Sequence, residues 1–253
     1  MNSSLPKKLN CDISIKIYDS SSGSISFLER KEYTKYLGVL LDSHLSWNYH
    51  INYISSKISK FIGIICRLRH FVPYQTIFTI YRSLIAPYIH YGIIAWGRAA
   101  KTHINKILML QKRILRLMFF CNKYDTAIPL FLSTNFLPVS LLYFKSVAIL
   151  MYDISKKSCP ETFTRLVTHV SHTHHFQTQF SSKNTFQIKY SRLEIQRSSF
   201  SRTGARIWNI ISNDTKLLPK NKFKQEIHIS LLTLLQNEQT YLDIDQLIHL
   251  FTK

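Results

Sequence analysis

The chain has 253 residues, of which 45% are hydrophobic, so it can bury a core and is not an intrinsically disordered polymer. Its 33 Lys and Arg residues outnumber its 14 Asp and Glu residues and give a formal net charge of +19. This excess predicts a polyanionic partner, nucleic acid before an anionic membrane surface. The four cysteines are far apart, which argues against a disulfide framework or a structural zinc site.

The N-terminal segment predicts a short β-hairpin. Ile13, Ile15 and Ile17 alternate with polar residues, which is the period of a half-buried strand. A Ser- and Gly-rich turn follows, and residues 25–28 are expected to return as the partner strand. Residues 1–20 lack the continuous apolar core of a signal peptide, and no apolar run reaches the roughly 18 residues of a spanning helix. We therefore expect an intracellular protein, cytoplasmic or nuclear, without a membrane.

A third strand is expected over residues 33–41, because an apolar run of strand length lies there. Gly38 interrupts the run, as glycine does at a bulge or where another backbone comes close. Asp42 is expected to end the strand. Ser46 is expected to cap the next helix, since its hydroxyl can accept a hydrogen bond from an amide of the first turn.

After Trp47 the spacing of apolar residues changes from that of a strand to that of a helix. Apolar residues then recur every three or four positions and predict one buried helical face: Ile51, Ile54, Ile58, Phe61, Ile65 and Leu68. Pro73 is expected to end this helix. A second helix is expected from about Thr76 until Pro87 kinks or stops it, because proline removes a backbone donor. Its expected buried side comprises Ile77, Ile80, Tyr81 and Leu84.

A third helix is predicted over residues 102–120, with Ile104, Ile107, Leu108, Ile114, Leu115 and Met118 facing inward. Further helices are expected from about Pro138, over residues 223–235 and over residues 242–251, with a compact segment around Trp208. The polar stretch 168–203 is expected to be rich in loops. It contains a His-rich patch, His169, His172, His174 and His175, which we interpret as a solvent-exposed loop rather than a metal site.

The positive charge is concentrated in one part of the chain. No Asp or Glu occurs between Ser43 and Tyr124, while twelve Lys and Arg residues do: Lys57, Lys60, Arg67, Arg69, Arg82, Arg98, Lys101, Lys106, Lys112, Arg113, Arg116 and Lys123. No carboxylate of this segment can neutralise them. These charges must therefore face water, the rest of the chain or an external anion, which favours contact with phosphate groups.

Several motifs in this segment resemble one protein family when they are read together. They are KYLGVLLDSHLSWNYHI from Lys35, the segment Ile80–Tyr88, Tyr91-Gly92, Trp96-Gly97 and Leu110–Arg116, with a weaker likeness at Ile207-Trp208-Asn209 and Leu218-Pro219. In this order the sequence resembles the C-terminal part of reverse transcriptases from LINE-type (non-LTR) retrotransposons, over nearly the whole chain. That part comprises the end of the palm, the thumb and a C-terminal extension.

The resemblance and the periodicities together predict an α+β, mostly α, fold. A short N-terminal β segment should precede a helical thumb-like bundle and further helices. We expect a palm-end β segment at residues 1–45, a helical thumb-like domain at 46–125 and a C-terminal helical extension at 126–253.

The resemblance also implies candidate site residues. Tyr36, Leu37 and Gly38 fall where the palm-end hairpin of the family positions the primer terminus. The basic helices fall where its thumb follows the template–primer backbone, which gives nine candidate nucleic-acid-binding residues: Lys57, Lys60, Arg67, Arg69, Arg82, Lys106, Lys112, Arg113 and Arg116. The expected partners are the backbone of an RNA–DNA or DNA duplex and the missing palm part of a longer product.

The catalytic machinery of the family is not found in this sequence. The family holds Mg²⁺ with an aspartate of an early palm strand and an aromatic-Ala-Asp-Asp box, whereas this chain has no Asp-Asp pair. We assign no catalytic residue, metal ligand or cofactor to the chain and expect Mg²⁺ only for the complete polymerase. The predicted function is that of a truncated RNA-directed DNA polymerase, inactive alone, that retains template–primer-binding parts.

Two other functions fit the same charge pattern. One is a non-enzymatic helical adaptor that uses its basic face for nucleic acid or a protein. The other is a peripheral membrane protein with basic amphipathic helices.

Overall fold

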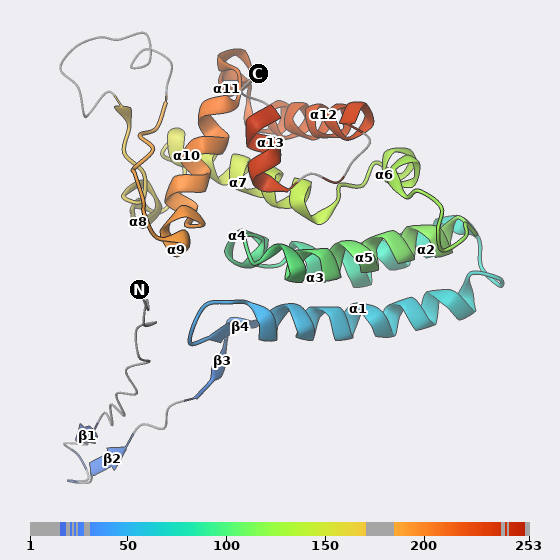
Figure 1. The fold of residues 1–253 in the computed structure, drawn as a ribbon, viewed down its shortest axis with the longest axis horizontal. Coiled ribbons are helices and arrows are strands. Elements are labelled where there is room, and N and C mark those ends of the chain that lie inside the picture. Colours follow the sequence, from blue (N-terminus) through green and yellow to red (C-terminus); the bar gives the residue numbers. More distant parts are fainter. Residues whose placement is uncertain are drawn as a thin grey trace, which may run out of the picture.

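The structure, a computed structural model, describes residues 16–18, 21, 23, 25–27, 31–170, 185–238, 241 and 243–250. The predicted mostly helical α+β class is confirmed (Figure 1). Two separate antiparallel hairpins precede the helices and are formed by β1 (Lys16–Tyr18) with β2 (Ile25–Phe27), and β3 (Tyr33–Tyr36) with β4 (Val39–Asp42). The first hairpin is the predicted one, although Ile13 and Ile15 lie outside the described residues.

The prediction of one bulged strand over residues 33–41 is wrong, because the chain reverses at Leu37 and Gly38. Both residues have positive φ, 46° and 82°, and β3 pairs with β4 on either side of them, from Tyr36 opposite Val39 to Tyr33 opposite Asp42. Two successive positive φ angles are typical of the tight hairpin turns whose twist matches that of the strands. Sequence reasoning missed the turn because leucine rarely adopts this conformation.

The first group of helices surrounds two long parallel ones. α1 (Asn48–Leu68) and α5 (Lys101–Met118) pack along each other in the same direction, since Lys106 Nζ bonds Asn52 Oδ1 near their starts and Arg69 bonds the Leu117 carbonyl near their ends. In the sequence, α1 and α5 are separated by four shorter segments. α2 (Tyr74–Ile80), η1 (Tyr81–Ile85) and α3 (Ala86–His90) follow one another directly and form a rod, and α4 (Ile93–Trp96) comes next. The predicted buried face of α5 is confirmed, and so is that of α1 except that Phe61 and Leu68 are only partly buried and Ile62 is buried as well.

Pro87 does not stop the second helix, because α3 continues to His90. The irregularity appears just before it, as the π-helical turn η1. This wider turn accommodates the proline ring and the missing N–H donor. It also shifts the helical register, so that Ile77, Tyr81, Ile85 and Ile89 are buried, whereas Leu84, expected to be buried, is 42% exposed.

The second group of helices packs around α7 (Val139–Ser155), which begins directly after Pro138 as predicted. The other members are α6 (Ile128–Thr134), α8 (Glu161–Thr164), α9 (Glu194–Arg197), α10 (Phe200–Ile210), α11 (Asn213–Leu217), α12 (Lys220–Glu238) and α13 (Ile244–Leu250). Within the described residues, no single helix has the length and apolarity to cross a membrane; α6 and α7 pass that test only jointly, across a 44° bend.

One continuous hydrophobic core joins the two groups of helices. It extends from Ile51 in α1 to Ile248 in α13, and its largest fully buried side chains are Trp96 in α4 and Trp208 in α10. α4 packs directly on α7 and so connects the groups. The proposed division at residues 45 and 125 stays a prediction.

Candidate nucleic-acid interface

Four of the nine candidate residues lie on the exposed sides of two adjacent helices, α1 and α5. Lys60 and Arg67 on α1 are seven residues apart, as are Lys106 and Arg113 on α5. Seven residues are two helical turns, or about 10.5 Å, so each pair points to one side of its helix. That side lies opposite the buried faces, and all four side chains are exposed. We call these four residues the outer basic face.

The outer basic face has no acidic residue of its own. α1 and α5 run parallel, so the Lys60–Arg67 pair and the Lys106–Arg113 pair follow the chain in the same direction. Small residues, including Ser56, Ser59 and Gly63, also occupy the exposed side of α1. Lys106 bonds the Asn52 side chain at 3.0 Å. Lys60, Arg67 and Arg113 make no hydrogen bond or ion pair with any residue that the structure describes. Such unpaired cations can neutralise phosphate groups of a duplex without reading its sequence.

Other candidate residues contact the protein itself. The Lys57 ammonium lies 5.5 Å from the centre of the Tyr53 ring on the flank of α1. The Arg69 guanidinium lies 4.8 Å from the centre of the Phe120 ring and donates a hydrogen bond to the Leu117 carbonyl. Lys57 thus contacts its own helix, and Arg69 ties the end of α1 to the end of α5.

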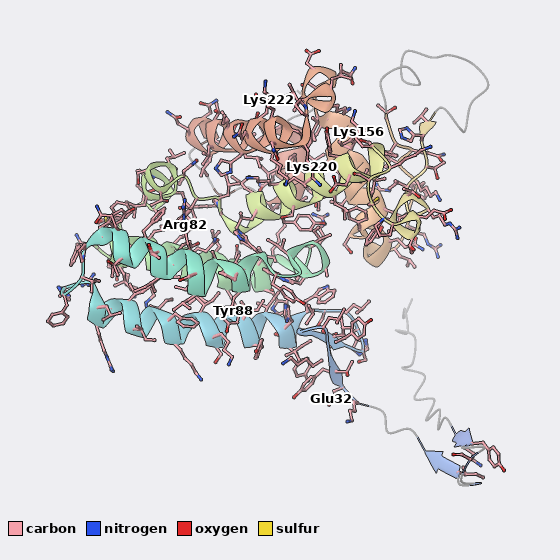
Figure 2. All side chains as sticks on the ribbon, turned by 180° about the vertical axis from the view of Figure 1, so that it is seen from behind. Glu32, Arg82, Tyr88, Lys156, Lys220 and Lys222 are labelled. Atoms are coloured by element: carbon pink, nitrogen blue, oxygen red, sulfur yellow. The ribbon has the colours of Figure 1, made fainter. Side chains whose placement is uncertain are left out.

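Lys112 and Arg116 lie on the other flank of α5. The Lys112 ammonium is 3.6 Å from the centre of the Tyr241 ring, and Arg116 donates to the Asp125 carbonyl at 2.8 Å. Burial, together with the nearby Arg116 charge, lowers the pKa of Lys112. The ninth residue, Arg82, lies on η1, on the side that faces α6 and α7 (Figure 2).

Two cations of the acid-free segment are neutralised by the C-terminal end of the chain, which sequence reasoning missed. Arg98 pairs with Asp245 at 2.8 Å, and Lys101 pairs with Asp243 at 2.5 Å. Partial burial works to raise the pKa of Asp245, but the Arg98 and Arg206 guanidinium groups outweigh it and hold the pKa below its usual value. The sequence feature that could have indicated these ion pairs is the Asp-Ile-Asp motif at residues 243–245, in a chain with few acidic residues.

The three residues assigned to primer positioning form the turn of the β3–β4 hairpin. Tyr36 is 63% exposed and Leu37 is 72% exposed, so both project into solvent. The Tyr91 hydroxyl donates a hydrogen bond to the Leu37 carbonyl. A Cβ atom at Gly38 would lie 3.3 Å from the Tyr91 ring, and the φ of Gly38 is 82°. The turn is thus held against the segment that follows α3, and its role in primer positioning stays a prediction.

The remaining motif residues hold this hairpin on the helices. The His50 ring accepts a hydrogen bond from the Leu40 amide and contacts the buried Trp96 ring, whose Nε1–H donates to the Tyr91 carbonyl. Burial lowers the pKa of His50, which favours its neutral form as an acceptor. Gly92, with φ of 64°, allows Val39 to pack closely. The motifs of residues 35–51 and 91–97 therefore contact each other in space.

Asp42 organises the start of α1. Its carboxylate accepts hydrogen bonds from the backbone amides of His44, Ser46 and Trp47 and from the Ser46 hydroxyl. The prediction that Ser46 caps α1 is wrong, because the N-cap residue is Trp47 and it makes no side-chain cap bond. The Ser46 hydroxyl accepts only a long bond, 3.4 Å, from the Asn48 amide, and Asp42 provides most of the contacts. Burial works to raise the pKa of Asp42, but these hydrogen bonds outweigh it and lower the pKa below its usual value.

The first prediction concerns this carboxylate. Asp42→Asn should lower the free energy of unfolding by about 2 kcal/mol near neutral pH, because the amide can no longer accept bonds at both positions. The folded-state pKa of Asp42 is depressed, so its contribution is present above the usual value and is lost as the pH falls through the lowered value. Urea unfolding at a series of pH values, from 7 to below the usual aspartate range, should show the difference between wild type and variant shrinking as the pH falls. Asp214→Asn, at an exposed position, is the matched control.

No group of three or more potential metal ligands occurs among the described residues. His169 pairs with Phe186 in a short β-bridge, and their rings lie 4.2 Å apart. The remaining members of the His-rich patch, His172, His174 and His175, lie outside the described residues. The described part of this patch thus packs against an aromatic ring.

Comparison with known proteins confirms the predicted resemblance over part of the chain. Over 86 residues, 32% of this chain, the sequence is 37% identical to the RNA-directed DNA polymerase from mobile element jockey of Drosophila melanogaster. It is 34% identical over 91 residues, 34% of this chain, to the probable RNA-directed DNA polymerase from transposon X-element, and 30% identical over 103 residues, 38% of this chain, to that from transposon BS, both of the same species.

The similarity covers about a third of the chain rather than nearly all of it. The aligned segments make up 9%, 10% and 11% of these three relatives, so the chain spans about a tenth of their length. No family model matches the chain, and no solved structure matches it.

Proposed function

We propose that this chain is a nucleic-acid-binding part of an RNA-directed DNA polymerase of a mobile element, with template–primer-binding parts but without the catalytic aspartates. The outer basic face carries the proposal. Four exposed cations lie along two parallel helices, and no acidic residue of the same segment balances them. A duplex presents regularly spaced phosphates, and such a surface binds them independently of sequence.

The relatives support the choice of partner, because they are named RNA-directed DNA polymerases and DNA synthesis on an RNA template yields an RNA–DNA duplex. The chain itself lacks an Asp-Asp pair, and four of its described acids make structural contacts. Asp42 caps α1, Asp153 pairs with Lys220, and Asp243 and Asp245 pair with cations. We therefore assign duplex binding to this chain and nucleotidyl transfer to residues that it does not contain.

The test is a binding titration with the purified chain and fluorescently labelled RNA–DNA duplexes of two unrelated sequences. We expect equal affinity for both duplexes and an affinity that falls steeply as salt increases, by about a hundredfold between about 50 and 200 mM for four phosphate contacts. We expect no primer extension with Mg²⁺ and deoxynucleotides. Salt-independent binding would contradict duplex recognition by this face, and primer extension would contradict the absence of a catalytic site.

A further inference from the structure

A second basic site lies on the opposite side of the α2–η1–α3 rod from α1. It is a recess of about 520 Å³ between η1, α3, α7 and α12. Its polar lining comes from five elements or connections and includes Arg82, His90, Asn135, Lys145 and His228. All residues that line it are described, and none of them is Asp or Glu. Figure 2 shows Arg82 at this position, between the rod and α6.

The hydrogen bonds of the recess fix the role of each group. Lys145 Nζ lies 3.2 Å from His228 Nδ1, and His228 Nε2 lies 2.9 Å from Asn135 Oδ1. An ammonium group can only donate, so His228 accepts at Nδ1 and donates from Nε2 to Asn135, which is the neutral tautomer. Lys145 has three N–H donors, and this bond uses one of them. The other donors are available to an acceptor in the recess.

The charges of the recess are unbalanced. Burial, together with the Lys224 charge, lowers the pKa of Lys145, and burial together with the Lys145 charge lowers that of His228 and of His90. The Arg82 guanidinium lies 4.3 Å from the centre of the Phe78 ring and makes no hydrogen bond or ion pair with the described residues. Lys145 is therefore a partly buried cation with a second cation, Lys224, nearby, while Arg82 is exposed at the mouth of the recess, and a bound anion would offset this positive charge.

We propose that this recess binds a phosphate group through Lys145 and Arg82, with His90 and His228 at its border. Phosphate offers only acceptor oxygens, which match the donors of an ammonium and a guanidinium group. The phosphate belongs either to a nucleic-acid strand that also contacts the outer basic face or to a free phosphate compound. The first source rests on the proposed function, whereas the second does not.

The experiment uses the full chain and inorganic pyrophosphate, titrated by isothermal calorimetry. We expect saturable pyrophosphate binding that Lys145→Gln weakens about tenfold. Arg82→Gln should also weaken this binding, and it tests the proposal independently because Arg82 lies on another element. Lys222→Gln is the matched control, because Lys222 is exposed on α12 and does not line the recess (Figure 2). Thermal unfolding of each variant verifies that it is folded. No pyrophosphate binding, or equal weakening by Lys145→Gln and Lys222→Gln, would overturn the proposal.

A second set of titrations with labelled RNA–DNA duplex identifies the source of the phosphate. If Lys145→Gln weakens duplex binding and pyrophosphate competes with the duplex, the recess takes a strand phosphate. If the variant weakens only pyrophosphate binding, the recess takes a free phosphate compound. A chain that binds pyrophosphate but no duplex would refute the proposed function and leave the recess assignment standing.

Discussion

Replacement of Gly97 with alanine is expected to lower the free energy of unfolding by about 3 kcal/mol, although it adds a single methyl group. A Cβ atom at this position would lie 2.6 Å from the Ile93 carbonyl oxygen and even closer to the ring of Tyr143. Tyr143 is 1% exposed and belongs to α7, so its ring cannot swing away. Gly97 is thus the position that allows α4 to pack against α7 and connects the two helix groups.

Gly63 provides a matched control for the same chemical change. It lies on the exposed side of α1, and a Cβ atom there would meet nothing within 4 Å. Alanine favours the helix, so Gly63→Ala should raise the free energy of unfolding by about 0.5–1 kcal/mol. Urea unfolding followed by circular dichroism compares the two variants with wild type. Equal effects of the two substitutions would show that the close packing at Gly97 does not limit stability.

Most of the helical fold could be predicted from the sequence, because the signals are local. The buried faces of α1 and α5 follow from apolar residues three and four positions apart, and Pro138 directly precedes α7. The β3–β4 turn could not be predicted, since Leu37 adopts positive φ only where the hairpin docks on Tyr91. The exposure of Leu84 follows from a π-helical turn, which the spacing of apolar residues in the sequence does not predict.

The candidate site was predictable as a set of charges but not as a surface. Charge counting does not distinguish Lys60 and Lys106 from Lys112. The structure does, because the first two are exposed on adjacent helices, whereas Lys112 is partly buried against the Tyr241 ring. The pairing of Arg98 with Asp245, 147 residues later, depends on where α13 packs. The same holds for the recess, because its cations come from elements that are distant in the sequence.

Conversion of the outer basic face to glutamine is expected to abolish most of the salt-dependent part of duplex binding. The variant carries Lys60→Gln, Arg67→Gln, Lys106→Gln and Arg113→Gln. Each phosphate contact contributes about 0.9 to the slope of log affinity against log salt, so the slope should become shallower by about 3.6. Three of the four side chains have no partner among the described residues, and the fourth bonds only an asparagine, so stability should change little.

The control is a variant with the same change in net charge at exposed lysines elsewhere: Lys156→Gln, Lys157→Gln, Lys189→Gln and Lys222→Gln. If only total charge attracts the duplex, both variants should lose the same affinity and the same slope. If the arrangement on α1 and α5 matters, the control should keep most of the wild-type slope, because its lysines lie outside these two helices. Fluorescence anisotropy over a series of salt concentrations distinguishes these two results. Equal losses of affinity and slope in the two variants would show that the outer basic face contributes no more than other positive parts of the surface.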